Sequence, residues 1–399
     1  MLVKKYQDML STKSIIRMMS TAAIERGKTV GYENVFDFTI GNPSVPTPPE
    51  FTKVMIELLE QRNPMELHGY SPNMGILSVR QAVADSLHQR FGVPYEAKNI
   101  FMVSGATSAL VHAIRCVVAP GDEVLTFAPF FPEYHPYVEG AGAVLKIVPP
   151  QFDTFQINFE EFLARLNEKT TAVLINTPNN PSGIVYSEET IKKLTDILKE
   201  KQKEYGHDIY IISDEPYREI LFDGVSCPCI SRFYDNAIMC YSFSKSISLP
   251  GERIGYVAVN PAIPQAEVMV NMFVQISRQL GHNCPASIIQ LAVAEVLDKT
   301  SDISIYEANM NLLYDCLINL GFTVVKPSGT FYIFPKALEE DATAFCNKAL
   351  KYNVVLVPGD NFGAPGYFRL SYCIDTEKVQ RSLKAIEEFV KAEYGISHA

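Results

Sequence analysis

Residues 171–215 contain two short apolar runs, TAVLINTP (171–178) and DIYIISDE (208–215), on either side of the helical pattern SEETIKKLTDILKEKQKEYG (187–206). In both runs the apolar residues are continuous rather than alternating, and a turn or a polar segment follows. Continuous apolarity indicates a strand buried on both faces, which is typical of a parallel sheet covered by helices. Ser187 is the expected N-cap of the helix between them.

Five further runs of the same kind extend this pattern along the chain: NIFMVSG (99–105), DEVLTFAP (122–129), GAVLKIVP (142–149), AIMCYSFS (237–244) and IGYVAVN (254–260). Helical patterns separate several of them, as in TSALVHAIRCVVA. Together the seven runs predict a doubly wound α/β domain with a mostly parallel seven-stranded sheet.

The pattern changes after residue 284, where one long helical stretch (286–321) is followed by short strands and helices with an antiparallel character. We therefore expect a smaller C-terminal α+β domain at 285–399 and a large ligand-binding domain at 46–284. An N-terminal segment (1–45), with a helix at 13–27, is expected to join the small domain.

Composition excludes several classes of protein. The net charge is −10 and no block of Lys and Arg could follow a phosphate backbone, so we expect no nucleic-acid partner. No run of eighteen apolar residues occurs, so we expect no membrane span. The eight cysteines are scattered without a CxxC pair, which favours reduced thiols, no metal site and a cytoplasmic location.

Ligands of open α/β sheets bind beyond the carboxyl ends of the strands. Five strand ends here carry residues suited to chemistry, and they are SGATSAL (104–110), PFFPEY (129–134), NTPNNPSG (176–183), DEPYREI (214–220) and SFSKSISLPGERIG (242–255). The first opens a helix with small residues, which suits a phosphate. The second supplies aromatic rings that could stack on a flat ligand. The third holds an amide in a rigid turn.

Each of these segments also has a plain structural explanation: an ordinary N-cap, core packing, or a turn. Asp214 needs a further explanation, because a carboxylate at the end of a buried strand requires a cationic partner, either an arginine or a protonated ligand nitrogen. Lys245 lies among serines, where it could be an exposed loop residue. As a set, however, the five segments match a phosphorylated pyridine aldehyde, with its phosphate on the helix N-terminus and its aldehyde on Lys245.

The stretch SFSKSISLPGERIG resembles the pyridoxal-phosphate attachment signature of the class I/II aminotransferases, the fold-type I, aspartate-aminotransferase-like group. Six other segments fall in the family's order along nearly the whole chain: IGNPSVPTP, GYSPNMG, SGATSAL, NTPNNPSG, SDEPY and FRLSY. The resemblance implies a pyridoxal-phosphate-dependent transferase of fold type I.

The resemblance also implies a role for each matching residue. Lys245 is the attachment and proton-transfer residue, Asp214 pairs with the ring nitrogen, and Tyr217 hydrogen-bonds the phenolic oxygen together with Asn180. Phe131 stacks on the ring. The phosphate ligands it implies are Gly105, Ala106, Thr107, Ser242 and Arg253.

For the substrate, the resemblance implies that Arg369 binds the α-carboxylate, helped by Gly41 and Asn180. Tyr70 would reach the phosphate of a neighbouring subunit, which implies a homodimer with shared active sites. As alternatives, Arg369 could form a structural ion pair and Tyr70 could be a core residue.

The implied reaction moves an amino group from an L-amino acid to a 2-oxo acid such as 2-oxoglutarate by a ping-pong mechanism. The frequency of such donors in the family is the sole reason to favour an aspartate-like amino donor. Arg278 and Arg232 are unassigned candidates for binding its second carboxylate. The alternative is a carbon–sulfur β-lyase, which uses the same lysine and arginine, or a related amino-acid lyase on the same fold. A cofactor-binding transcription regulator is disfavoured, because no basic helix-turn-helix precedes the catalytic portion.

Overall fold

The computed structural model describes residues 2–10 and 14–396. Its main sheet has seven strands, in the spatial order β2 (Ile100–Val103), β8 (Gly255–Val259), β7 (Ala237–Ser242), β6 (Tyr210–Asp214), β5 (Thr170–Asn176), β3 (Glu123–Phe127) and β4 (Val144–Val148). Only β8 runs antiparallel to its neighbours, β2 and β7. The predicted mostly parallel seven-stranded sheet is therefore confirmed, with every strand where the sequence pattern expects it.

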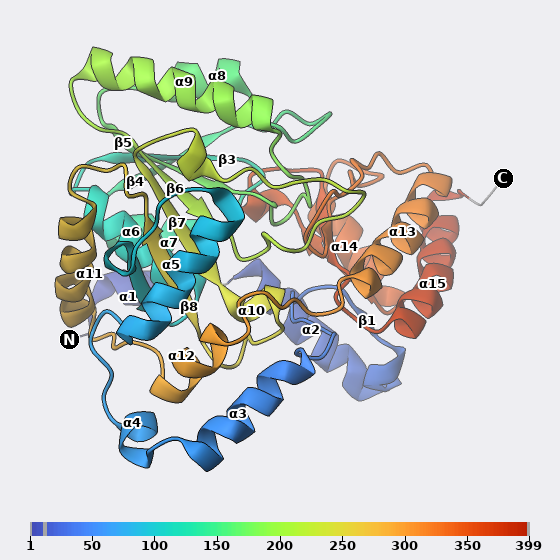
Figure 1. Ribbon diagram of the computed structural model, residues 1–399. Coiled ribbons are helices and arrows are strands. Elements are labelled where there is room, and N and C mark those ends of the chain that lie inside the picture. Colours follow the sequence, from blue (N-terminus) through green and yellow to red (C-terminus); the bar gives the residue numbers. More distant parts are fainter. Residues whose placement is uncertain (1, 11–13, 397–399) are drawn as a thin grey trace.

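Helices cover both faces of this sheet (Figure 1). One face packs against α6 (Ala106–Val117), α7 (Tyr134–Gly140) and α11 (Ala266–Leu280). The other packs against α5 (Leu77–Phe91), α8 (Phe159–Arg165) and α9 (Glu188–Tyr205). Ser187 caps α9 as expected, since its hydroxyl accepts a hydrogen bond from the Thr190 amide at 3.0 Å. The central strands are thus buried on both sides, which explains their continuous apolar sequences.

A second core lies to the right of the sheet in Figure 1. It is built from α13 (Ser304–Asn319), α14 (Ala342–Lys351), α15 (Thr376–Tyr394) and a three-stranded antiparallel sheet of β11 (Val357–Pro358), β12 (Phe368–Ser371) and β9 (Tyr332–Ile333).

The N-terminal segment packs into this second core. Helix α2 (Ile15–Val30) contributes Met19 and Ala23, and β1 (Phe36–Asp37) pairs in parallel with β10 (Val354–Val355). Residue 13 of the expected N-terminal helix lies outside the described residues. The domain limits at 45/46 and 284/285 stay a prediction.

The expectation of one long helical stretch at 286–321 is wrong. The structure has two helices there, α12 (Ser287–Ala294) and α13, separated by a polar turn. In that turn the Ser301 amide donates to the Ser246 carbonyl at 2.8 Å, and the Ser301 hydroxyl donates to the Pro46 carbonyl at 3.1 Å. The first bond ties the Ser301 amide to the loop beside Lys245 in place of a helical bond, and the second ties its side chain to the segment around Pro46, far earlier in the sequence. Helix α12 packs against the large sheet's core through Ile289 and Val293.

The remaining helices are short or peripheral, and they are α1 (Lys4–Met9), α3 (Pro49–Gln61), α4 (Pro64–His68) and α10 (Phe243–Ser246), with 3-10 turns at Tyr32–Asn34, Ala97–Asn99, Ile230–Arg232 and Asp360–Phe362. Within the ranges that the structure describes, no helix combines the length and apolarity needed to cross a membrane.

Candidate active site

A cavity of about 280 Å³ lies at the carboxyl ends of β5, β6 and β7, where the large sheet meets β9, β12 and the start of α2. Eleven of the residues predicted from the sequence line it, and they are Gly41, Ala106, Thr107, Phe131, Asn180, Asp214, Tyr217, Ser242, Lys245, Arg253 and Arg369. Two predicted residues do not line it. Gly105 directly precedes the lining segment of α6, whereas Tyr70 lies elsewhere on the surface.

Lys245 reaches the cavity because β7 ends at Ser242 and turns at once into the short helix α10. Ser242 caps this helix, its hydroxyl accepting from the Ser244 amide at 3.1 Å. The Lys245 Nζ donates to the Gly41 carbonyl at 2.6 Å. Burial lowers the Lys245 pKa to about 8, and the charges of Arg253 and Arg369 act in the same direction. The amine is therefore partly unprotonated near neutral pH, as a nucleophile or base must be.

Asp214 is the last residue of β6 and is only 5% exposed. The Tyr134 hydroxyl donates to its Oδ2 at 2.6 Å, while its Oδ1 is buried without a hydrogen-bond partner. Burial raises the Asp214 pKa to about 7; the bond from Tyr134 opposes this rise, and the charge of Glu215 adds to it. A buried carboxylate oxygen without a donor is unfavourable, so the site is suited to a protonated nitrogen from a ligand.

A chain of polar side chains joins the strand ends around Asp214. The Asn176 Nδ2 donates to the Asp214 carbonyl at 2.8 Å, and the Asn176 Oδ1 accepts from the Asn180 amide at 2.7 Å. The hydroxyls of Tyr217 and Tyr332 lie 3.2 Å apart. These contacts fix an amide and a phenol on the cavity wall, where each can hydrogen-bond a ligand oxygen.

The N-terminus of α6 lies at one end of the cavity. Its N-cap, Gly105, has φ +84°, and no side chain caps the helix. The Arg253 Nη2 donates to the Ser104 carbonyl at 3.2 Å, and a Cβ on Gly105 would lie 2.7 Å from that nitrogen. Glycine is therefore required for the guanidinium to lie this close to the helix. With the hydroxyls of Thr107 and Ser242, the arrangement suits a phosphate.

Arg369, on β12, supplies a buried cation at the cavity wall and is 1% exposed. Its Nη1 donates to the Asn180 Oδ1 at 2.9 Å and its Nη2 donates to the Thr39 carbonyl at 2.5 Å, while its Nε has no partner. The guanidinium carbon lies 4.6 Å from the centre of the Tyr332 ring. No ion pair within the described part of the chain involves Arg369. The structure therefore does not support a structural ion pair for this residue, and it leaves the guanidinium available to an anionic ligand.

Tyr70 follows α4 and its side chain is fully exposed, so the alternative of a core position is wrong. Its loop is nevertheless held in place, because the Gln290 amide donates to the Ser71 hydroxyl at 3.1 Å and the Ser287 hydroxyl donates to the Gly69 carbonyl at 2.9 Å. Neither Arg278 nor Arg232 lines the cavity.

Sequence reasoning missed several residues on the cavity wall: Ile16, Ile40, Asn176, Ser244 and Tyr332. It offered Tyr134 as one of the aromatic residues after β3, but not as the partner of Asp214. Asn176 and Ser244 could have been found, because Asn176 is the last residue of β5 and Ser244 follows the end of β7 by two residues. Tyr332 and Ile16 belong to segments far away in sequence, and nothing local marks them. Tyr332 also explains Gly41, since a Cβ at that position would lie 1.9 Å from the Tyr332 hydroxyl oxygen.

These features fit pyridoxal phosphate. The group has an anionic phosphate for the α6 end, a ring nitrogen for the unpartnered oxygen of Asp214, a phenolic oxygen for Tyr217, and an aldehyde for the amine of Lys245. The partly exposed ring of Phe131 borders the same space. No residue on the cavity wall conflicts with this fit.

Comparisons with known proteins agree with the site. The profile of the family described as aminotransferase class I and II matches residues 33–386. The chain is 30% identical to the aspartate aminotransferase of Thermotoga maritima over 90% of its own length and 92% of the relative's. It is 31% identical to aromatic-amino-acid aminotransferase 2 of Thermococcus litoralis, over 90% and 93% of the two chains.

A solved structure of an amino transferase from Eubacterium rectale superimposes with a TM-score of 0.95 at 43% identity, covering 99% of this chain and 100% of that one. The aspartate aminotransferase structure from Thermotoga maritima gives a TM-score of 0.85 at 28% identity. With the family profile spanning most of the sequence and the cavity suited to its cofactor, this chain belongs to the class I and II aminotransferases, enzymes of fold type I that depend on pyridoxal phosphate.

Proposed function

We propose that the enzyme moves the amino group of an L-amino acid to a 2-oxo acid such as 2-oxoglutarate, in two half-reactions of ping-pong order. The observation that carries this proposal is that the amine of Lys245 and the unpaired guanidinium of Arg369 line one cavity. An amino acid presents a reactive amine and a carboxylate two bonds apart, so it can meet both groups at once.

The bound cofactor would supply an electron-withdrawing ring that stabilises negative charge at the substrate α-carbon. In this proposal Asp214 Oδ1 accepts a hydrogen bond from the protonated ring nitrogen, and Tyr217 and Asn180 contact the phenolic oxygen. Phe131 packs on the ring. The phosphate ligands are Gly105, Ala106, Thr107, Ser242 and Arg253. The free oxygen of Asp214 and the uncapped N-terminus of α6 support these assignments.

Lys245 has two tasks in the proposed reaction. Its Nζ would hold the cofactor at the aldehyde carbon. When the substrate amine has displaced it, the freed Nζ would take the proton from the substrate α-carbon and deliver it to the former aldehyde carbon of the cofactor. The lowered pKa of about 8 supports this role, because a lysine at its ordinary value near 10.5 would be almost entirely protonated at neutral pH.

Arg369 would hold the α-carboxylate of the substrate, with Asn180 and the backbone at Gly41 beside it. A guanidinium binds a carboxylate through two parallel hydrogen bonds, which fixes the orientation of the substrate as well as its affinity. The unpartnered Nε of Arg369 supports this role, since it is a donor that is already desolvated.

For the donor we propose an aspartate-like amino acid, supported by the names of several relatives. Among the described residues, the charged side chains that line the cavity are Asp214, Lys245, Arg253 and Arg369. The first three have tasks toward the cofactor and the fourth toward the α-carboxylate. A second substrate carboxylate would therefore need a cation from a neighbouring subunit. Titrating the enzyme with single amino acids and following the absorbance of the bound cofactor tests the assignment.

Incubating the enzyme with an amino acid but no 2-oxo acid distinguishes a carbon–sulfur β-lyase from a transaminase. A transaminase completes one half-reaction, releases one equivalent of 2-oxo acid and stops with a changed cofactor absorbance. A lyase turns over continuously to pyruvate and ammonia. Continuous release of pyruvate from a cysteine-like donor would overturn the proposed function.

We also propose a homodimer in which each subunit supplies Tyr70 to the other's phosphate site. The full exposure of this aromatic side chain on a well-anchored loop supports the proposal. The chain is further proposed to work in the cytoplasm, since all eight cysteines are free, as expected in a reducing compartment. The domain division at residues 45/46 and 284/285 belongs to the same proposal.

A further inference from the structure

A buried ion pair lies directly beside Asp214 but outside the cavity. Glu215 is 0% exposed and Arg218 is 3% exposed. The Nε of Arg218 donates to Glu215 Oε2, and the Ser213 hydroxyl donates to Glu215 Oε1 at 2.7 Å. Both carboxylate oxygens are therefore satisfied, yet none of these three residues lines the cavity. The proposed reaction does not use them.

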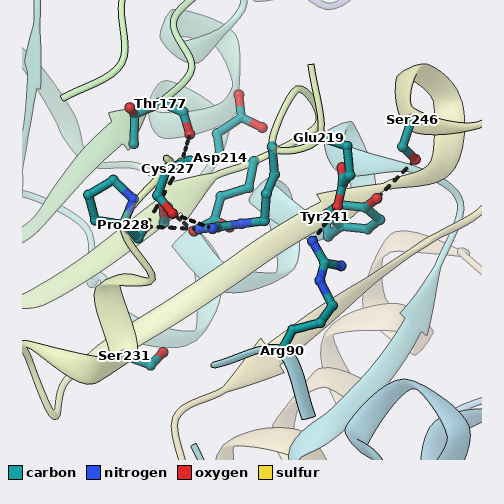
Figure 2. A network of polar contacts seen from close by, with 12 residues as sticks. Arg90, Thr177, Asp214, Glu219, Cys227, Pro228, Ser231, Tyr241 and Ser246 are labelled. Atoms are coloured by element: carbon teal, nitrogen blue, oxygen red, sulfur yellow. Dashed lines mark hydrogen bonds and ion pairs between the residues drawn. The ribbon is translucent and has the colours of Figure 1, made fainter. Parts of the chain in front are cut away.

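The guanidinium of Arg218 also reaches a distant segment. Its Nη1 donates to the Cys227 carbonyl at 3.1 Å and its Nη2 donates to the Pro228 carbonyl at 3.1 Å. The Cys227 thiol in turn donates to the Thr177 carbonyl at 3.3 Å, just beyond the end of β5. Figure 2 shows Thr177, Cys227 and Pro228 gathered together near Asp214. One side chain thus ties the turn after β6 to the segment that contacts the end of β5.

Charge makes this pair necessary. Two consecutive carboxylates, Asp214 and Glu215, are buried at the end of one strand, and an uncompensated buried carboxylate is strongly unfavourable. Burial raises the pKa of Cys227 to about 12, so its thiol is neutral and adds no charge. Within the described residues, Arg218 is the cation paired with Glu215.

The turn from residue 214 to residue 218 has two sides. Asp214 and Tyr217 line the cavity, whereas Glu215 and Arg218 do not. The rear side is fixed by the four hydrogen bonds described above, those of Arg218 and that of Ser213. If the rear side were released, Glu215 would no longer be held away from the ligand side, and the direction of the Asp214 side chain would depend on its bond from Tyr134 alone.

We propose that Arg218, acting through Glu215, is a positioning residue that holds Asp214 toward the ring nitrogen of the cofactor. This rests on the proposed role of Asp214. Arg218 itself touches no ligand in this account. It holds Glu215, which directly adjoins Asp214, so the main effect of its loss should fall on the Asp214 contact.

The test uses two ligands that differ at one atom. The dissociation constant is measured, by the absorbance of the bound group, for pyridoxal phosphate and for its deaza analogue, in which a C–H replaces the ring nitrogen. A hydrogen bond to a charged group contributes on the order of tenfold in affinity, so Arg218→Gln is expected to weaken pyridoxal phosphate binding by about tenfold. Binding of the analogue should stay within about twofold of wild type, because it makes no bond to Asp214.

Arg90→Gln is the matched control. Arg90 forms the neighbouring ion pair, with its Nη2 2.8 Å from Glu219 Oε1, and both Arg90 and Arg218 lie 4.9 Å from the centre of the Phe91 ring. Figure 2 shows Arg90 pointing toward Glu219, away from Thr177 and Cys227. Its loss removes a comparable charge without touching the turn, so the preference for pyridoxal phosphate over the analogue should be unchanged.

Asp214→Asn shows how much of the preference for pyridoxal phosphate over the analogue is lost when the Asp214 contact is removed. Arg218→Gln should approach this loss. Equal weakening of both ligands by Arg218→Gln, or no weakening, overturns the proposal. If Arg218→Gln does not fold, Arg218→Lys takes its place, because lysine keeps the charge but not the three hydrogen bonds of the guanidinium. This variant must also weaken pyridoxal phosphate binding more than analogue binding. If it does not, the proposal is overturned. A wild-type enzyme that binds both ligands alike would instead contradict the role of Asp214 in the proposed function.

Discussion

Replacing Arg369 with lysine tests how the enzyme recognises its substrate. The guanidinium is held between the Asn180 side chain and the Thr39 carbonyl, at 2.9 Å and 2.5 Å, and is 1% exposed. Its third donor group, Nε, has no partner. Lysine keeps the positive charge but offers a single nitrogen in place of the planar fork, so it cannot bind both carboxylate oxygens and both protein acceptors together.

The expected magnitude follows from the hydrogen bonds lost. A hydrogen bond to a charged group contributes about 1.5–3 kcal/mol, and replacing the guanidinium with a single ammonium group removes one bond to the substrate carboxylate. We therefore expect kcat/KM for an L-amino acid to fall by about 10- to 150-fold, at about 1.4 kcal/mol for each factor of ten. The poorer contacts with Asn180 and Thr39 act in the same direction.

The assay is the first half-reaction under single-turnover conditions, followed by the absorbance of the bound cofactor. The amino acid is compared with its α-carboxamide, which has no negative charge for Arg369 to bind. Arg369→Lys should slow the half-reaction of the amino acid by the stated factor. The half-reaction of the amide, which is slower in wild type, should stay within about threefold of its wild-type rate. Equal losses for the two substrates, or full activity with the amino acid, would refute the assignment. Unchanged affinity for pyridoxal phosphate serves as the control.

Three further predictions concern the cofactor site and the dimer. Lys245→Ala should give no reduced adduct after borohydride treatment and should lose at least about 100-fold in turnover, since the base is missing; full activity contradicts the mechanism. Burial raises the Asp214 pKa to about 7, so the folded cofactor-free protein binds that proton more tightly than the unfolded chain does. The free energy of unfolding should thus decrease as pH rises from about 4 to about 7. Between pH 5 and pH 8, urea unfolding should show that wild type loses on the order of 3 kcal/mol more than Asp214→Asn. The same pH dependence in both proteins would contradict this. Mixing Tyr70→Ala and Lys245→Ala subunits should give activity that neither variant has, because a hybrid dimer holds one intact site; no gain after subunit exchange argues against shared sites.

The sequence by itself determined the sheet and much of the site. Six of the seven apolar runs are buried almost throughout, so their composition marks them without any knowledge of neighbours; the seventh, the edge strand β4, is partly exposed. Asp214 and Lys245 lie at or just beyond strand ends, and all parallel strands bring their carboxyl ends to one edge. For the residues at these strand ends, position along the chain therefore already implied position in space, whereas Gly41 and Arg369, which line the same cavity, were predicted from the resemblance to the family.

Only the tertiary structure decided the partners of these residues. The free oxygen of Asp214 depends on Tyr134, which occupies the other oxygen from a helix eighty positions away. The space around Gly41 depends on Tyr332, and the rear anchor of Asp214 depends on carbonyls at Cys227 and Pro228. Such contacts are set by how separate elements pack, and no local pattern encodes them. The long helical stretch expected at 286–321 is interrupted for the same reason, since the Ser301 amide between α12 and α13 bonds to the Ser246 carbonyl of a distant loop.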